Sequence, residues 1–146
     1  MTDVWEASVD ELMTSLILRL PLSTVAEMAL CGAMLFGSRG AVTAARTTRP
    51  EDWSEPDLEA IARTCLDVSE AGGTVEPISV CAALEESEAR PLTGGWTLRI
   101  VDCMSACTVP SAAPAWAAII RRTAAKRRRV LKAVTTIQKD LEVDRT

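Results

Sequence analysis

Charged side chains that could bind a ligand or a partner are most concentrated in a run of basic residues near the carboxyl end of the chain. Seven of the sixteen Lys and Arg residues fall within positions 121–132: Arg121, Arg122, Lys126, Arg127, Arg128, Arg129 and Lys132. An arginine side chain grips a carboxylate or a phosphate with two hydrogen bonds. On a helix, successive residues are about 100° apart. Arg121, Arg128 and Lys132 would then lie near one side, and Arg122, Lys126 and Arg129 near another.

Three interpretations of this basic patch stay open from the residues alone. It is a solvated helix surface that complements acidic neighbours, it pairs with an acidic surface of another subunit, or it binds phosphate groups of DNA. Base-specific recognition is disfavoured, because aromatic and amide side chains do not alternate with the charges. Residues 1–110 also have a net charge of −10, against +6 for residues 111–146, and would repel phosphate outside the patch.

The residue types that most enzymes need are scarce. The chain has no His and no Gly-Lys pair, which excludes Ser-His or Cys-His nucleophiles and a phosphate-binding P-loop. The acidic pairs Glu51-Asp52 and Glu85-Glu86 are typical of solvated surfaces. We therefore expect no catalytic site, no cofactor and no metal site. In the absence of a CxxC pair or a secretory signal, the five cysteines are expected to be reduced, buried thiols of a cytoplasmic protein: Cys31, Cys65, Cys81, Cys103 and Cys107.

The spacing of apolar residues predicts an all-α fold, with a compact helical globule of about six helices followed by one long C-terminal helix. Residues 1–20 are predicted to form an extra N-terminal amphipathic helix that Pro21 ends. Residues 21–108 are predicted to form the helical globular domain. No segment has the roughly 18–20 uninterrupted apolar residues that span a membrane.

Local patterns predict several helix ends inside the globule. Thr24 and Glu27 have the spacing of a capping box at the start of a central, almost entirely apolar helix. Gly32, inside that helix, predicts the close approach of another helix. Ser54 is predicted to cap a helix that ends at Gly72-Gly73, and Gly94-Gly95 is predicted to be a turn into a further helix.

Residues 109–146 are predicted to form the long basic helix, continuous from about Ala112 to Leu141. Thirty residues would span ~45 Å at 1.5 Å per residue, so part of the helix should project from a domain of this size. Its apolar residues recur at three- and four-residue spacing, which predicts an interface with another protein surface. The predicted interface residues are Trp116, Ile119, Ile120, Val130, Leu131, Val134 and Ile137.

A set of short motifs follows a fixed order along the chain. They are Pro21, Ala26-Glu27 and Cys31-Gly32; Pro50-Glu51-Asp52-Trp53; Gly72-Gly73-Thr74-Val75-Glu76; Gly94-Gly95; and Trp116-Ala117-Ala118-Ile119-Ile120-Arg121, followed by Arg127-Arg128. In this order and at these spacings, the motifs resemble the N-terminal domain of the replicative DNA helicase of the DnaB type. The resemblance covers about residues 21–133.

This resemblance implies an all-α globule followed by a long helical hairpin. In the family, hairpins pair into dimers, and three dimers form a ring-shaped collar above the hexameric motor, where primase and loader proteins dock. The final long helix resembles the first arm of that hairpin. The resemblance therefore implies a non-catalytic interaction and oligomerisation module of DNA replication, with itself, a replicative helicase or a primase as partners. The alternative is a nucleic-acid-binding protein that contacts DNA weakly through the basic helix.

Overall fold

The computed structural model describes residues 8–12, 14, 15, 19–92 and 94–145, and every regular element in these residues is helical. The predicted all-α class is confirmed. Residues 8–12, 14 and 15 are helical, whereas Trp5, Met13, Leu16 and Ile17 of the predicted N-terminal helix lie outside the described residues. The elements that follow are α2 (Thr24–Leu35), α3 (Arg39–Ala45), η1 (Pro50–Asp52), α4 (Pro56–Glu70), α5 (Pro77–Glu86), α6 (Trp96–Ala106), η2 (Pro110–Ala112) and α7 (Ala113–Arg145).

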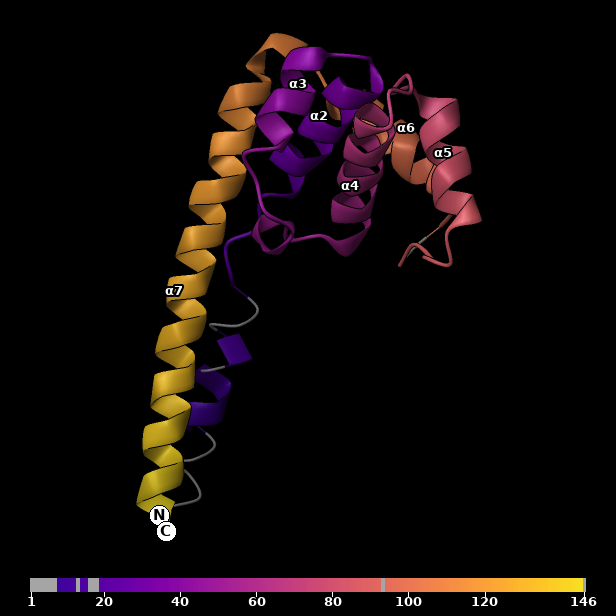
Figure 1. Cartoon of the computed structure of the whole chain (residues 1–146). Coiled ribbons are helices and arrows are strands. Elements are labelled where there is room, and N and C mark those ends of the chain that lie inside the picture. Colours follow the sequence, from indigo (N-terminus) through magenta and orange to yellow (C-terminus); the bar gives the residue numbers. More distant parts are fainter. Residues whose placement is uncertain (1–7, 13, 16–18, 93, 146) are drawn as a thin grey trace.

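The long C-terminal helix is continuous and projects from the globule, as predicted (Figure 1). α7 has 33 residues, which corresponds to about 50 Å. Its first half packs on the globule, because Ala113, Ala117 and Ile120 belong to the hydrophobic core. Its second half extends beyond the other labelled helices in Figure 1. The long helix is therefore partly a core element and partly an exposed rod.

α2 is the central helix of the globule. Leu30, Cys31, Ala33 and Met34 have no exposed surface, and α2 packs against α3, α4, α6 and α7. Large aromatic residues are few, so small and aliphatic side chains fill the core and allow the helices to approach closely. Trp96 is buried in that core, and Trp53 packs against it while still partly exposed.

The close helix approach predicted at Gly32 is present between α2 and α6. A Cβ atom at position 32 would lie 2.8 Å from Cβ of Cys107 and closer still to the backbone oxygen of Cys103. Both positions are inside the ordinary contact distance of about 3.5 Å. Only glycine therefore allows the carboxyl end of α6 to pack directly on the α2 backbone.

Two of the predicted helix caps are wrong, because their side chains serve a contact between helices. α2 begins after Ser23, whose side chain does not cap it, and Glu27 bonds groups outside the first turn. α4 begins after Glu55 without a side-chain cap. The predicted glycine positions are correct: Gly72 and Gly94 have φ values of +80° and +67°, which favour glycine, after α4 and before α6.

Three thiols meet in the core and all five cysteines are unpaired. Cys31, Cys65 and Cys103 have no exposed surface. Burial, and next a hydrogen bond with Cys103, raise the pKa of the Cys31 thiol well above its usual value. Burial raises the pKa of Cys65 to about 12. Cys31 and Cys65 therefore stay protonated near neutral pH and act as small apolar side chains.

No single helix among the described residues has both the length and the apolar composition to cross a membrane. Only the pair formed by Trp96–Ala106 and Pro110–Asp144, which meet at 89°, reaches that threshold when the two are taken together.

The substitution Gly32→Ala should destabilise the fold by about 1–3 kcal/mol, because the new methyl group overlaps the α6 backbone. Urea unfolding followed by circular dichroism measures this change. Gly40→Ala is the matched control, since its Cβ would meet only the Ser38 hydroxyl at 3.8 Å and alanine favours helix. Equal stability of Gly32→Ala and the wild-type protein would contradict the close approach.

Candidate protein interface on the long helix

A buried carboxylate joins α2 to the segment that precedes α4. The Glu27 side chain has no exposed surface. Its oxygens accept hydrogen bonds from the Ser54 backbone at 3.0 Å, the Glu55 backbone at 3.1 Å, the Ser54 hydroxyl at 2.5 Å and the Ser23 hydroxyl at 2.6 Å. Because four donors surround the carboxylate, it is tolerated in the interior without a cationic partner. This network fixes the path of the chain from η1 into α4.

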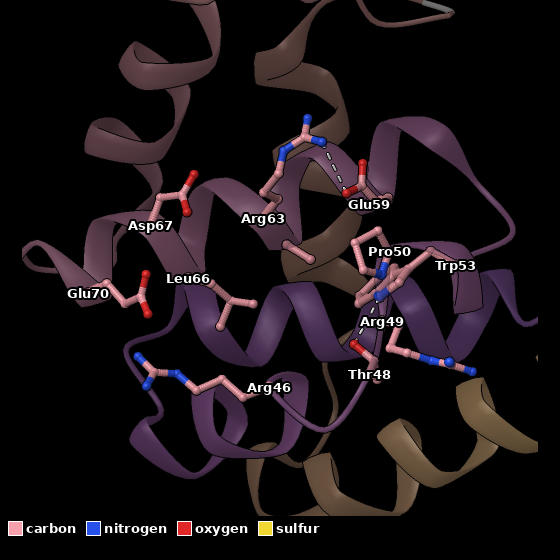
Figure 2. Close-up of a pocket in the computed structure, with 11 residues that line it drawn as sticks. Arg46, Thr48, Arg49, Pro50, Trp53, Glu59, Arg63, Leu66, Asp67 and Glu70 are labelled. Carbon is pink, nitrogen blue, oxygen red and sulfur yellow. Dashed lines mark hydrogen bonds and ion pairs between the residues drawn. The ribbon is translucent and has the colours of Figure 1, made fainter.

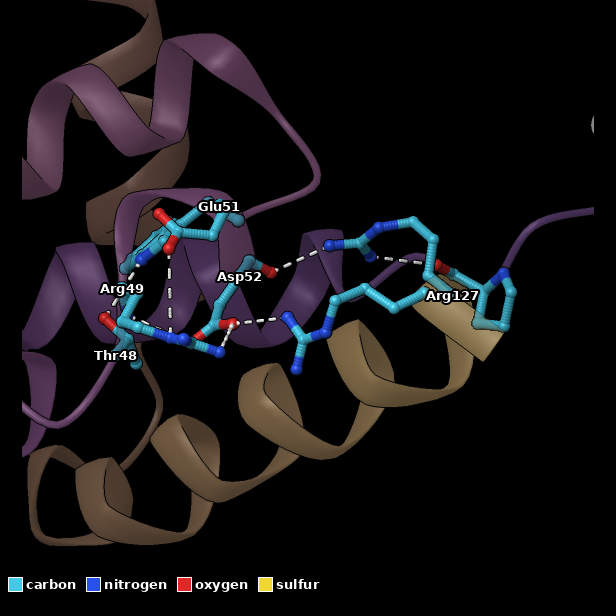
Figure 3. A network of polar contacts seen from close by, with 8 residues as sticks. Thr48, Arg49, Glu51, Asp52 and Arg127 are labelled. Atoms are coloured by element: carbon cyan, nitrogen blue, oxygen red, sulfur yellow. Dashed lines mark hydrogen bonds and ion pairs between the residues drawn. The ribbon is translucent and has the colours of Figure 1, made fainter. Parts of the chain in front are cut away.

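The η1 turn, which precedes that network, contacts the long helix through Asp52 (Figure 3). The Asp52 side chain is 3% exposed. Its carboxylate accepts hydrogen bonds from the Arg49 backbone and from Arg128, both at 2.9 Å. Its backbone oxygen accepts from Arg127 at 2.9 Å, and Arg127 also donates to the backbone oxygen of Pro21 at 3.1 Å. Arg127 and Arg128 therefore hold the middle of α7 against the globule.

The predicted basic patch divides into two groups. Arg121, Arg127 and Arg128 bond within the subunit, the first of them to the Thr47 hydroxyl. The side chains of the other four are exposed and make no hydrogen bond or ion pair with any described residue: Arg122, Lys126, Arg129 and Lys132. The first of the three interpretations was a solvated helix surface that complements acidic neighbours. It fits Arg128, which pairs with Asp52, and it also fits the four exposed cations. Those four side chains are equally accessible to a partner, so the other two interpretations stay predictions.

The predicted interface residues lie in three different environments. Ile120 and Val134 are 0% and 4% exposed, so their side chains have no free surface for another protein. Trp116 is partly exposed and Ile119 is 37% exposed, and both line a groove beside α2. The other three lie beyond the Arg127–Asp52 contact and keep exposed surface: Val130, Leu131 and Ile137.

The groove runs between the amino-terminal half of α2 and the first turns of α7. It has a volume of about 530 Å³. Leu22, Val25 and Ala29 form one wall, and Trp116 and Ile119 form the other. Leu22 and Val25 are absent from the sequence-based prediction. Their 3.6-residue spacing with Ala29 was the available signal, but α2 is apolar on nearly every face, which concealed the exposed stripe.

A second hollow lies between the end of α3, η1 and α4, and it is lined by both charged and apolar side chains (Figure 2). It has a volume of about 230 Å³. The Trp53 indole donates to Thr48 at 3.0 Å, and Arg63 pairs with Glu59 at 3.2 Å. Arg46 and Glu70 also line it. Opposite charges balance around this hollow, and the part of the chain that is described holds no group of three metal-ligating side chains.

Comparison with known proteins finds one matching family model and a solved structure with a similar fold. A family model described as the DnaB-like helicase N terminal domain matches residues 19–122. The crystal structure of the N-terminal domain of DnaB helicase from Mycobacterium tuberculosis is similar, with a TM-score of 0.76 and 24% sequence identity. That similarity covers 82% of this chain and 86% of the other. A search of the curated proteins finds no match.

The substitution Glu27→Gln should destabilise the protein by about 2 kcal/mol. The amide replaces one acceptor by a donor and loses the charge, so the four donors around it cannot all be satisfied. Thermal or urea unfolding measures the change. Glu51→Gln is the control, because the Glu51 side chain is 62% exposed and should change stability by less than about 0.5 kcal/mol. Equal effects of the two substitutions would show that the Glu27 network is not stabilising.

Two neighbouring arginines should differ in their effect on stability. Arg127→Gln removes hydrogen bonds to two backbone oxygens and should cost about 1–2 kcal/mol, whereas Arg129→Gln should be nearly neutral because Arg129 bonds no described residue. Chemical unfolding of the two variants gives the comparison. A destabilisation by Arg129→Gln as large as that by Arg127→Gln would contradict the division of the basic patch.

Proposed function

This chain belongs to the DnaB-like helicase N-terminal domain family, and from that premise we propose that it is a non-catalytic interaction and oligomerisation module of DNA replication. Its role would correspond to that of a helicase collar, which brings subunits together and receives a replicative helicase or primase. We place this activity in the cytoplasm, where replication proteins of this type act. The absence of His and of a Gly-Lys phosphate-binding sequence in the 146 residues supports a binding role.

The observation that carries this proposal is the apolar surface on the projecting half of α7. Leu131 and Ile137 are 41% and 44% exposed. On a helix they lie about 60° to either side of Val134, which is itself only 4% exposed. The centre of the apolar stripe is covered within the subunit, and its two edges are free.

Such edges favour pairing with a second copy. A helix that lies alongside α7 would cover Leu131 or Ile137 and leave the charged side chains of the opposite face in water. Burial of a large aliphatic side chain contributes about 1.5–3 kcal/mol, and a symmetric contact counts each side chain twice. Arg129 and Lys132 lie about 140° and 160° from Val134 around the helix, so they belong to the charged face that stays in water.

A weak contact with DNA is the second candidate. It is supported by the four basic side chains of α7 without a partner in the described structure. It is disfavoured because Arg121, Arg127 and Arg128 are engaged within the subunit. Four phosphate contacts at most would leave an affinity that falls steeply as salt is added.

Light scattering coupled to size-exclusion chromatography tests the self-association. The wild-type chain should be dimeric or larger at micromolar concentration, and the double substitution Leu131→Glu and Ile137→Glu should produce a monomer, because a charge cannot be buried in an apolar contact. Thr136→Glu is the matched control on the opposite face of α7, where Thr136 is exposed. A wild-type protein that is monomeric at every concentration, or a control that dissociates as readily, would contradict the proposal.

A further inference from the structure

The groove between α2 and α7 has the shape that receives a helix. Val25 and Ala29 lie one turn apart on α2, and Leu22, which precedes α2, extends the same wall. Trp116 and Ile119 form the facing wall on α7. Ala106 and Thr108, at the carboxyl end of α6, contribute to the same lining. Two parallel rows of apolar side chains with an open channel between them bind the apolar face of an amphipathic helix.

Two apolar side chains beside this groove are exposed. Val25, in the first turn of α2, is 76% exposed, and Leu22, which precedes α2, is 60% exposed. Nothing in the fold requires apolar side chains at these two positions, because other faces of α2 supply the core. Their exposure is therefore unexplained by stability and is typical of a docking surface.

The charges beside the groove are positive. Arg122 and Lys126 follow Ile119 by three and seven residues, which places them on the same face of α7. Neither side chain makes a hydrogen bond or an ion pair with a described residue. The first turn of α2, which borders the groove through Thr24, already holds the buried Glu27 carboxylate, so the positive charge beside the groove comes from α7. The nearby Glu55 carboxylate already accepts a hydrogen bond from Thr24.

We propose that this groove, formed by Leu22, Val25, Ala26, Ala29, Trp116 and Ile119, binds an acidic amphipathic helix of a partner protein. The apolar face of that helix would pack between α2 and α7, and its carboxylates would pair with Arg122 and Lys126. This site is separate from the self-association face, since it lies on the globule and not on the projecting half of α7. Self-association and helix binding can therefore fail independently.

Two labelled peptides of about 15 residues provide the probe, a length at which designed helices become stable. Both carry the same leucine stripe, and their polar faces carry glutamate in one peptide and lysine in the other. Fluorescence anisotropy with the full chain should show saturable binding of the glutamate peptide, at least about tenfold tighter than that of the lysine peptide. The joint substitution of Arg122→Glu and Lys126→Glu should reverse this preference.

Matched variants locate the binding site. Val25→Asp should weaken binding of the glutamate peptide by about tenfold or more. Ile78→Asp is the control: Ile78 is as exposed as Val25 (79% against 76%) but lies on α5, outside the groove, so this substitution should leave binding unchanged. The double substitution Leu131→Glu and Ile137→Glu should leave peptide binding intact even if it abolishes self-association. Circular dichroism and thermal unfolding confirm that each variant is folded.

Three results would overturn the proposal. One is equal binding of the two peptides, and another is a loss of binding in Ile78→Asp as large as that in Val25→Asp. The third is binding of single-stranded DNA at low salt that is lost when Arg122 and Lys126 are replaced but is unchanged by Val25→Asp, while the protein binds the two peptides equally. That result would assign the two cations to phosphate binding instead.

Discussion

The arrangement of this domain depends on the burial of one carboxylate. Glu27 lies on the central helix without a cationic neighbour, so the chain must supply hydrogen-bond donors to it, and Ser23, Ser54 and Glu55 do so. An unsatisfied buried carboxylate would cost several kcal/mol. The requirement to satisfy it therefore holds the segment between η1 and α4 in one position against α2.

That position determines where the long helix leaves the globule. With Ser54 and Glu55 bound to Glu27, the preceding Asp52 faces α7 and meets Arg127 and Arg128. Before these arginines α7 buries Ala117 and Ile120 in the core, and after them Leu131 and Ile137 are exposed. One helix thus has a half that is packed on the core and a half that keeps exposed apolar side chains, and a polar contact separates the two.

Much of the fold could be predicted from local sequence. Gly72 and Gly94 mark turns because positive φ values favour glycine, and Gly32 marks a helix crossing because any side chain would meet α6. The Thr24–Glu27 capping box could not be judged locally. The same residue spacing suits a cap and a long-range contact, and three of the four donors to Glu27 come from Ser54 and Glu55, which are 27 and 28 residues away in the chain.

By itself the sequence determined that the chain is helical, that about its last quarter is one continuous basic helix and that it resembles a helicase collar domain, because periodicity, charge and motif order are properties of the chain alone. Only the tertiary structure decided which of those residues are available to a partner. Ile119 and Ile120 are adjacent and equally apolar, yet Ile120 is buried and Ile119 is exposed. Arg128 and Arg129 are adjacent and equally charged, yet only the Arg128 side chain bonds a described residue. Exposure depends on what lies opposite a side chain, and in this domain that is α2 and the turn held by Glu27.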